Sequence, residues 1–237
     1  MGVSLTTISC VNWAFEFFRC RTPSSRNTTT YSISGMLFVG RGLRMDISSL
    51  PDLLGYGDLD RHGVTRHRLD RLVDEGSYER IAAGLFLRAG IVDDSTAAWM
   101  AIATKKPGAT ICLLSALAMH ELTDEIPTRT DIAIPRGGQP LVIQRAPITW
   151  HRFDAATFGI GRIEHPLPSG LAIGLYSPER TIIDIFRLRH EWGSDLAVGA
   201  LKRWLPERGN SPATLLALAE QFPKARPALQ NALEILL

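Results

Sequence analysis

Four basic side chains cluster between positions 66 and 71 of the chain: Arg66, His67, Arg68 and Arg71. An arginine can donate two hydrogen bonds to the O6 and N7 atoms of guanine, or it can clamp a phosphate. A histidine can donate to either kind of acceptor. These residue types at this spacing therefore suit the recognition of DNA.

A short amphipathic helix is predicted to position these side chains. Thr65 is a typical N-cap residue, and Gly76 stands where a glycine commonly ends a helix. Between them, apolar residues follow the spacing of one buried helical stripe, at Leu69, Leu72 and Val73. On this helix, from Thr65 to Glu75, His67 and Arg71 lie opposite the stripe, and the other two arginines lie on its flanks.

The surrounding sequence predicts a winged helix-turn-helix. Gly63 supplies the tight turn that lets two helices cross steeply enough for the second to enter a major groove. After Gly76, two short strands at 78–81 and 85–87 enclose a turn, and they predict a wing. The predicted DNA-binding residues on the helix and the wing are Thr65, Arg66, His67, Arg68, Arg71, Arg80 and Arg88.

The predicted DNA-binding domain is not basic as a whole. Residues 45–92 contain six arginines and eight acidic residues, so we expect a modest, salt-sensitive affinity that depends on local placement. Asp70, Asp74 and Glu75 should keep the C-terminal half of the helix away from phosphates. A second interpretation stays open, because a charged amphipathic helix is often only a solvated surface and helix-turn-helix modules also bind proteins.

Composition is ordinary for a globular protein. The chain has 237 residues, 45% of them apolar and 21% charged, enough for one large or two modest domains. Cys10, Cys20 and Cys112 form no C-x-x-C pair, so neither a disulfide framework nor a zinc site is predicted. No apolar run is long enough to span a membrane, and a signal peptide is not indicated. We therefore expect a cytoplasmic protein.

Three regions are predicted. Residues 1–44 carry five arginines and one glutamate, and the Ser-, Thr- and Arg-rich stretch at 21–34 has no apolar period. This composition predicts a disordered leader, either a start-site over-extension that ends before Met45 or a basic arm that adds phosphate contacts. The winged domain then occupies residues 45–92, and a second domain occupies residues 93–237.

The second domain is predicted to be α+β, with a mixed sheet and helices. Ser95 is predicted to cap a helix that ends at Lys105, and a nearly all-apolar helix is predicted from Ala109 to Leu122. Strands follow at 131–134, 141–144, 148–153, 161–164 and 171–176, with a hairpin turn at 137–138. Ser177 and Pro178 begin a helix to about Arg189, and three further helices follow at 194–204, 211–222 and 225–237.

The sequence contains no convincing catalytic motif. Ser115, His120 and Asp184 supply the residue types of a hydrolase triad, but Ser115 and His120 are five residues apart on one predicted helix and do not face each other. The histidines lack the spacing of a metal site, and the glycines at 159 and 161 lack the third glycine of a dinucleotide site. We therefore expect no enzyme, no metal and no cofactor.

The combination of several segments resembles the AbiEi family of antitoxins from type IV toxin-antitoxin, or abortive infection, systems. The segments are Gly57–Gly76 with the wing that ends at Phe86, the run Pro107–Leu122, and Tyr176–Asp184. The resemblance implies a repressor that binds the operator of its own operon through the winged domain. It also implies a C-terminal domain that counters a nucleotidyltransferase-like toxin, usually without a tight complex.

One departure and one alternative accompany this resemblance. Family members often place a basic residue in the wing where this chain has Ala82 and Ala83. The alternative is a nucleic-acid-processing enzyme tethered by its helix-turn-helix, with acidic residues of the second domain as its site, among them Glu164, Glu179 and Asp184. A neighbouring gene for a nucleotidyltransferase would favour the antitoxin.

Overall fold

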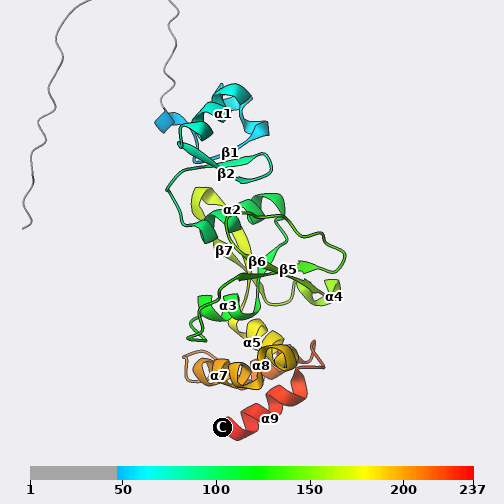
Figure 1. Ribbon diagram of the computed structural model, residues 1–237. Coiled ribbons are helices and arrows are strands. Elements are labelled where there is room, and N and C mark those ends of the chain that lie inside the picture. Colours follow the sequence, from blue (N-terminus) through cyan, green and yellow to red (C-terminus); the bar gives the residue numbers. More distant parts are fainter. Residues whose placement is uncertain (1–46) are drawn as a thin grey trace, which may run out of the picture. The chain divides into compact units, whose positions relative to one another are not determined.

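The computed structural model describes residues 47–237, which fold as an α+β protein with two sheets and several helices (Figure 1). The leader predicted over residues 1–44 lies outside the described residues. All described residues belong to one compact unit of the chain. The α+β class predicted from the sequence is therefore confirmed.

The first elements build a small sheet with one helix on it. In chain order they are η1 (Ile47–Ser49), β1 (Leu53–Gly55), η2 (Tyr56–Asp58), η3 (Asp60–His62), α1 (Arg66–Asp74), β2 (Tyr78–Ala82) and β3 (Leu85–Arg88). The three strands are antiparallel in the order β1-β3-β2. The hairpin predicted between residues 78 and 87 is thus confirmed, and β1 adds a strand that the sequence did not reveal.

Local signals set the limits of α1. The Thr65 hydroxyl accepts a hydrogen bond from the backbone N–H of Arg68 at 3.2 Å, as an N-cap does. Gly63 and Gly76 both adopt positive φ angles, 62° and 73°, which glycine tolerates best. The predicted helix and its two glycine turns are therefore confirmed. Within residues 47–237, however, the element directly before Gly63 is only the 3-10 turn η3, not the α-helix that the sequence predicted there.

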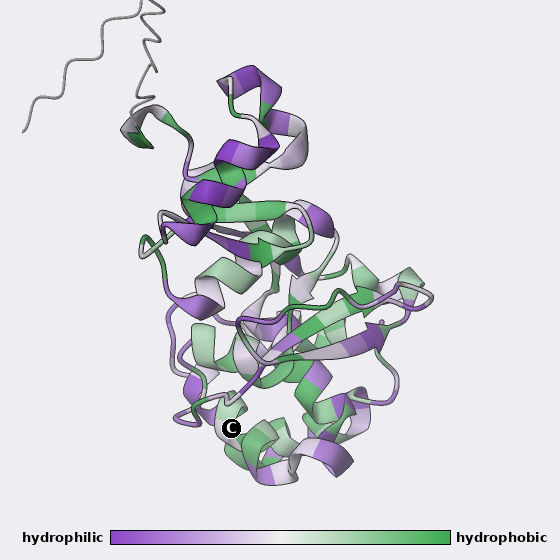
Figure 2. Cartoon of the chain, turned by 45° about the horizontal axis from the view of Figure 1, so that its top comes forward, coloured by the Kyte–Doolittle hydropathy of each residue, from purple (hydrophilic) through white to green (hydrophobic). Residues whose placement is uncertain are grey.

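The buried face of α1 rests on the small sheet. Leu69 and Leu72 are fully buried and pack in one cluster with Leu54, Tyr78 and Phe86. The residues of α1 and of the short helical turns before it are largely hydrophilic, whereas the strands that α1 packs on are largely hydrophobic (Figure 2). The basic residues of α1 consequently stand on the side that the sheet does not cover.

The rest of the chain forms a five-stranded mixed sheet with helices on both faces. Its elements are α2 (Asp94–Lys105), β4 (Thr110–Ile111), α3 (Leu113–Met119), β5 (Thr130–Pro135), β6 (Ile148–Phe153), α4 (Ala155–Phe158), β7 (Arg162–Pro166), η4 (Pro168–Gly170), β8 (Ala172–Tyr176), α5 (Pro178–Arg187), α6 (Arg189–Trp192), α7 (Ser194–Trp204), α8 (Pro212–Ala219) and α9 (Arg226–Leu236). The strand order is β6-β5-β4-β8-β7. Pairs β5/β6 and β4/β8 are parallel, and the other two pairs are antiparallel.

Alternation along the strands divides the core into two layers. Ile132 and Ile134 of β5 face the layer that contains α2, whereas Ala133 between them faces the layer of α3, α5 and α7. Helices α2 and α5 lie on opposite sides of the sheet in Figure 1. The first layer also takes Leu85 and Leu87 from the β2–β3 hairpin, so one hydrophobic cluster spans the domain boundary predicted between residues 92 and 93.

The long apolar helix predicted from Ala109 to Leu122 is wrong in its first part. Thr110 and Ile111 are extended and form the central strand β4, which pairs with β5 on one side and β8 on the other. A fully buried strand and a buried helix have the same all-apolar composition, so periodicity alone did not separate them. Helix α3 begins only after Cys112.

Three smaller predictions are also wrong. Residues 141–144 form no strand, and β5 and β6 run parallel, so Gly137 and Gly138 do not make a hairpin turn. Helix α2 is capped by Asp93, whose carboxylate accepts hydrogen bonds from the backbone N–H groups of Ser95 and Thr96 at 2.9 and 3.0 Å. Ser95 itself lies inside the helix. Asp93 is the N-cap because one of its carboxylate oxygens accepts from two of the N–H groups that have no partner within the helix.

Candidate nucleic-acid interface

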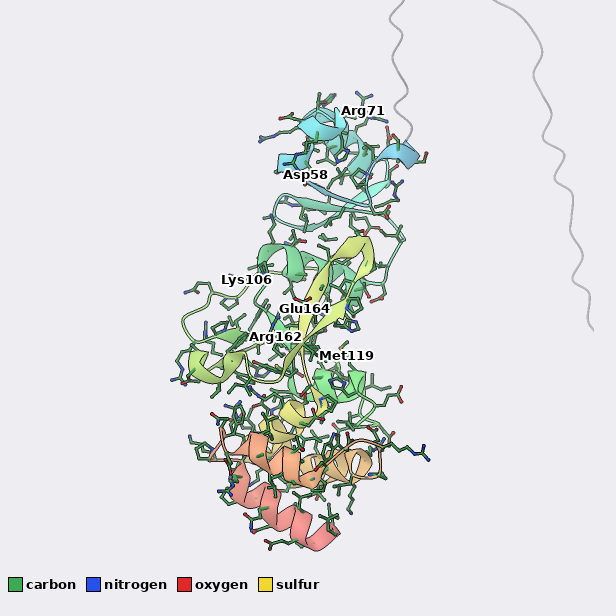
Figure 3. The ribbon with its side chains drawn as sticks, turned by 180° about the vertical axis from the view of Figure 1, so that it is seen from behind. Asp58, Arg71, Lys106, Met119, Arg162 and Glu164 are labelled. Carbon is green, nitrogen blue, oxygen red and sulfur yellow. The ribbon has the colours of Figure 1, made fainter. Side chains whose placement is uncertain are left out.

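The uncovered side of α1 presents three of the predicted side chains together. Arg66, His67 and Arg71 are all exposed, and within residues 47–237 neither arginine forms an ion pair. Figure 3 shows Arg71 on the outer side of α1. The Arg71 Nη2 atom lies 3.3 Å from His67 Nε2 one helical turn away. A guanidinium can only donate, so Arg71 is the donor in this contact.

An aromatic stack supports the start of the helix. The Arg66 guanidinium lies over the ring of Tyr56, 5.0 Å from its centroid, and that ring packs against Phe86 with centroids 5.4 Å apart. The guanidinium therefore gains a cation–π contact while it stays exposed to solvent. Tyr56 was not singled out from the sequence, since nothing in its neighbourhood marks it as a partner of a residue ten positions later.

Acidic residues restrict the interface to the first turns of α1. Arg68 is half-buried, and its Nη1 atom lies 3.8 Å from a carboxylate oxygen of Glu75. Asp70 and Asp74 are exposed on the same helix. Phosphates are repelled by these carboxylates, so Arg68 is less available to a nucleic acid than Arg71 is.

Arg61, just before the turn at Gly63, is a further exposed arginine that was not predicted from the sequence. Its side chain is 80% exposed on η3, and its Nη1 atom donates to Asp58 at 3.4 Å. This element precedes the turn at Gly63, and it had no apolar period that could show which way its side chains point. The exposed contact with Asp58 is weak and leaves most of the guanidinium free.

The two arginines of the hairpin differ from each other. Arg80 is exposed on β2, where its Nε atom lies 3.4 Å from the carbonyl oxygen of Ala82. Arg88 instead donates to the Asp52 carboxylate at 2.8 Å and to the backbone carbonyls of Ile47 and Leu50 at 3.1 and 2.5 Å. All three guanidinium nitrogens of Arg88 therefore donate to residues 47–52, which they hold against β3. Arg88 is less available to a nucleic acid than Arg80 is.

Residues of the considered hydrolase triad lie in three separate environments. Ser115 accepts from the backbone N–H of Asp131 at 2.8 Å, and His120 Nε2 contacts the carbonyl oxygen of Tyr176 at 2.7 Å. Asp184 is fully buried and accepts from Arg180 at 2.9 Å. The Asp131 carboxylate accepts a hydrogen bond from the Ser115 hydroxyl and also contacts His151 Nε2 at 2.8 Å. His151 therefore contacts the aspartate and not the serine hydroxyl. No nucleophile and base are paired in this set.

A buried charge cluster ties α5 to the sheet, and sequence reasoning recognised only its aspartate. Arg180 and Asp184 are both fully buried, and Arg187 Nη2 lies 2.9 Å from the second Asp184 oxygen. Arg180 also donates to the carbonyls of Thr157 and Ile160 at 2.7 Å, and its guanidinium lies between the rings of Tyr176 and Phe222. Burial raises the pKa of the Asp184 carboxyl, and the two arginines oppose this shift.

Within residues 47–237, no three His, Cys, Asp or Glu side chains are grouped so that they could hold a metal ion. No helix of that range is both long and apolar enough to span a membrane. The absence of a metal or cofactor in the function stays a prediction.

Comparison with known protein-family models and with curated proteins finds no match. The fold is similar to that in the crystal structure of the RV2827C protein from Mycobacterium tuberculosis, with a TM-score of 0.55. The two chains are 17% identical over 78% of this chain and 73% of that one. At this identity the similarity concerns the fold alone.

Proposed function

We propose that residues 47–92 form a winged helix-turn-helix that binds double-stranded DNA, with α1 as the recognition helix and the β2–β3 hairpin as the wing. The proposal extends to the whole protein, which we propose is an antitoxin and the autorepressor of a type IV toxin-antitoxin operon. It would act in the cytoplasm as a regulator, without catalysis.

The observation that carries the DNA-binding proposal is the free basic face of α1. Arg66, His67 and Arg71 are exposed within the first turns of a capped helix, on the side that the sheet leaves uncovered. Element order supports the same interpretation, because a tight turn precedes α1 and an antiparallel hairpin follows it.

The antitoxin part rests on the resemblance of three sequence segments to AbiEi proteins. Two of these segments meet in the second half of the chain, where the His120 imidazole contacts the carbonyl oxygen of Tyr176. The third contains α1 and the turn before it. Asp184, the strongest acidic candidate for a catalytic role, is accounted for by its ion pairs with Arg180 and Arg187, which favours the regulatory proposal over the enzymatic one.

DNA binding is tested with the purified full chain and a duplex that covers the region upstream of its own gene. Fluorescence anisotropy should show binding that weakens steeply with salt, and a reporter driven by this region should be repressed when the protein is expressed. An unrelated duplex of the same length should bind more weakly. Equal affinity for both duplexes, without repression of the reporter, would reject the autorepressor.

Antitoxin activity is tested by co-expression with the product of the neighbouring gene, if that gene encodes a nucleotidyltransferase-like protein. Growth should stop when the neighbour is expressed alone and recover when this chain is expressed with it. Size-exclusion chromatography of the two purified proteins should show separate peaks, because no tight complex is expected. Failure to restore growth at equal expression levels would reject the antitoxin proposal.

A further inference from the structure

A second basic surface lies beside the wing, in a groove formed by residues that are far apart in the sequence. We call it the wing groove: a cavity of about 560 Å³ whose lining includes Tyr56, Asp58, Arg80, Ala83, Gly84 and Lys105. Most of these residues belong to η2 and the hairpin, but Lys105 is the last residue of α2. Packing of α2 against the hairpin, through Leu85, Leu87 and Met100, holds this lysine next to the wing turn.

Direct contacts connect the wing groove to the recognition helix. Arg66 lies over the Tyr56 ring, and Tyr56 lines the groove. The same ring presses on the wing turn, since a Cβ atom added to Gly84 would lie 2.9 Å from the Tyr56 Cδ2 atom. Gly84 also has a φ of +64°, so the turn is suited to glycine for two reasons. The start of α1, the wing turn and the end of α2 therefore lie on one continuous surface.

The charge of the wing groove is suited to an anion. Arg80, Lys105 and the adjacent Lys106 form no ion pair with any residue in the described part of the chain. The one carboxylate in the lining belongs to Asp58, and it already accepts from the backbone N–H of Gly55 at 3.2 Å and from Arg61 at 3.4 Å. Lys106 follows at the C-cap of α2, and Figure 3 shows it on the same stretch of ribbon. The lysines also complement the negative end of the α2 dipole.

We propose that the wing groove binds the phosphate backbone of the duplex, with Lys105 and Arg80 as phosphate-binding residues. This inference rests on the proposed DNA-binding function. The wing itself offers only Ala82 and Ala83 at its turn, yet a winged helix commonly uses a basic residue there to contact the backbone that flanks the major groove. Lys105, brought in from α2, supplies that charge at the same place. The second half of the chain thereby takes part in DNA binding.

The test measures binding of the full chain to two duplexes, the upstream region of its own gene and an unrelated sequence, over a series of salt concentrations. A phosphate contact carries no sequence information, so Lys105→Gln should lower the affinity for both duplexes equally, by roughly fivefold at 0.15 M salt. It should also reduce the slope of log affinity against log salt concentration by about 1. Lys202→Gln is the matched control, since Lys202 is an exposed lysine on α7. It should leave affinity and slope unchanged.

A compensating variant locates the effect in the wing groove. Ala83 is exposed and lines the same groove, so Ala83→Lys in the Lys105→Gln background should restore the salt slope. An unchanged slope in Lys105→Gln, or no restoration by Ala83→Lys, overturns the wing groove. If Arg71→Ala still weakens binding in that case, the recognition-helix proposal stands and the wing-groove proposal fails. If the unmodified protein binds neither duplex, both proposals fall.

Discussion

At the scale of single residues, the exposed arginines of α1 differ in how freely they can reach a ligand. Arg71 has no ion-pair partner among the described residues, whereas Arg68 is half-buried and close to Glu75. We expect Arg71→Ala to weaken operator binding more than Arg68→Ala. Loss of a base contact costs about 1 to 3 kcal/mol at one base position, and loss of a phosphate contact lowers the salt slope by about 1.

Anisotropy titrations on operator variants distinguish these two kinds of contact. Both substitutions should change the free energy of unfolding by less than about 0.5 kcal/mol, because neither side chain is part of the core. Arg208→Ala, an exposed arginine beyond α7, serves as the control. Unchanged binding in both α1 variants would show that the recognition surface has been placed on the wrong side.

Asp184 gives the strongest prediction about a buried residue. Replacing it with asparagine leaves Arg180 and Arg187 without their counter-charge in a buried place, so Asp184→Asn should cost about 3–5 kcal/mol. Urea denaturation followed by circular dichroism measures this loss. A variant that stays as stable as the unmodified protein, yet loses a measurable nucleic-acid cleavage or transfer activity, would establish the enzyme instead.

At the scale of elements, the N-caps of α1 and α2 make a matched pair. Hydrogen bonds from the hydroxyl and the backbone N–H of Thr96 lower the pKa of Asp93 below its ordinary 3.8. A lowered pKa in the folded state adds stability that is present above pH 3.8 and is lost as the pH falls through the folded value. Asp93→Ala should therefore cost about 1 kcal/mol at pH 6 and clearly less near pH 2.5.

Thr65→Ala provides the control for this pH dependence. The Thr65 hydroxyl caps α1 through the backbone N–H of Arg68 and does not titrate, so its removal should cost about 1 kcal/mol at both pH values. Urea titrations at the two pH values measure both variants. If the Asp93 and Thr65 variants show the same pH dependence, the Asp93 carboxylate is not the group that titrates.

Elements set by neighbouring residues could be predicted, and those set by distant partners could not. Thr65, Gly63 and Gly76 fixed α1 because a cap and two positive φ angles act within a few residues. Thr110 became a strand residue because it pairs with Gly174, far along the chain, which no local pattern contains. The same contrast holds for the interface: the arginines of α1 follow from periodicity, whereas Tyr56 and Lys105 join them only through tertiary contacts.

At the scale of the whole molecule, the hairpin and α2 share a core, and this determines how the chain should unfold. Leu85 and Leu87 pack in one cluster with Met100 and with Ile173 of the large sheet. The Arg145 guanidinium adds polar links to Glu79 of β2 and Asp94 of α2. We expect one cooperative thermal transition for residues 47–237, which Met100→Ala should shift as a unit. Calorimetry that resolves two separate transitions would contradict the shared core.

Separation of the two proposed activities is expected in the full-length protein. The double variant with Arg66→Ala and Arg71→Ala should lose repression of the reporter yet still restore growth against the toxin, because both residues lie on α1, whereas the toxin is assigned to the second half of the chain. Reporter activity and growth are measured in the same cells. Loss of both activities in a folded double variant would mean that repression and protection are not separable.

Pairing of β4 with β8 also has a consequence for synthesis on the ribosome. Thr110 and Ile111 find their parallel partners only when Gly174 and Leu175 have left the exit tunnel, on the order of several seconds later. Until then β4 has a bare edge, and a bare strand edge invites pairing with other nascent chains. Translational pauses between the codons for residues 112 and 172 should therefore lower the yield of folded protein and increase its dependence on chaperones.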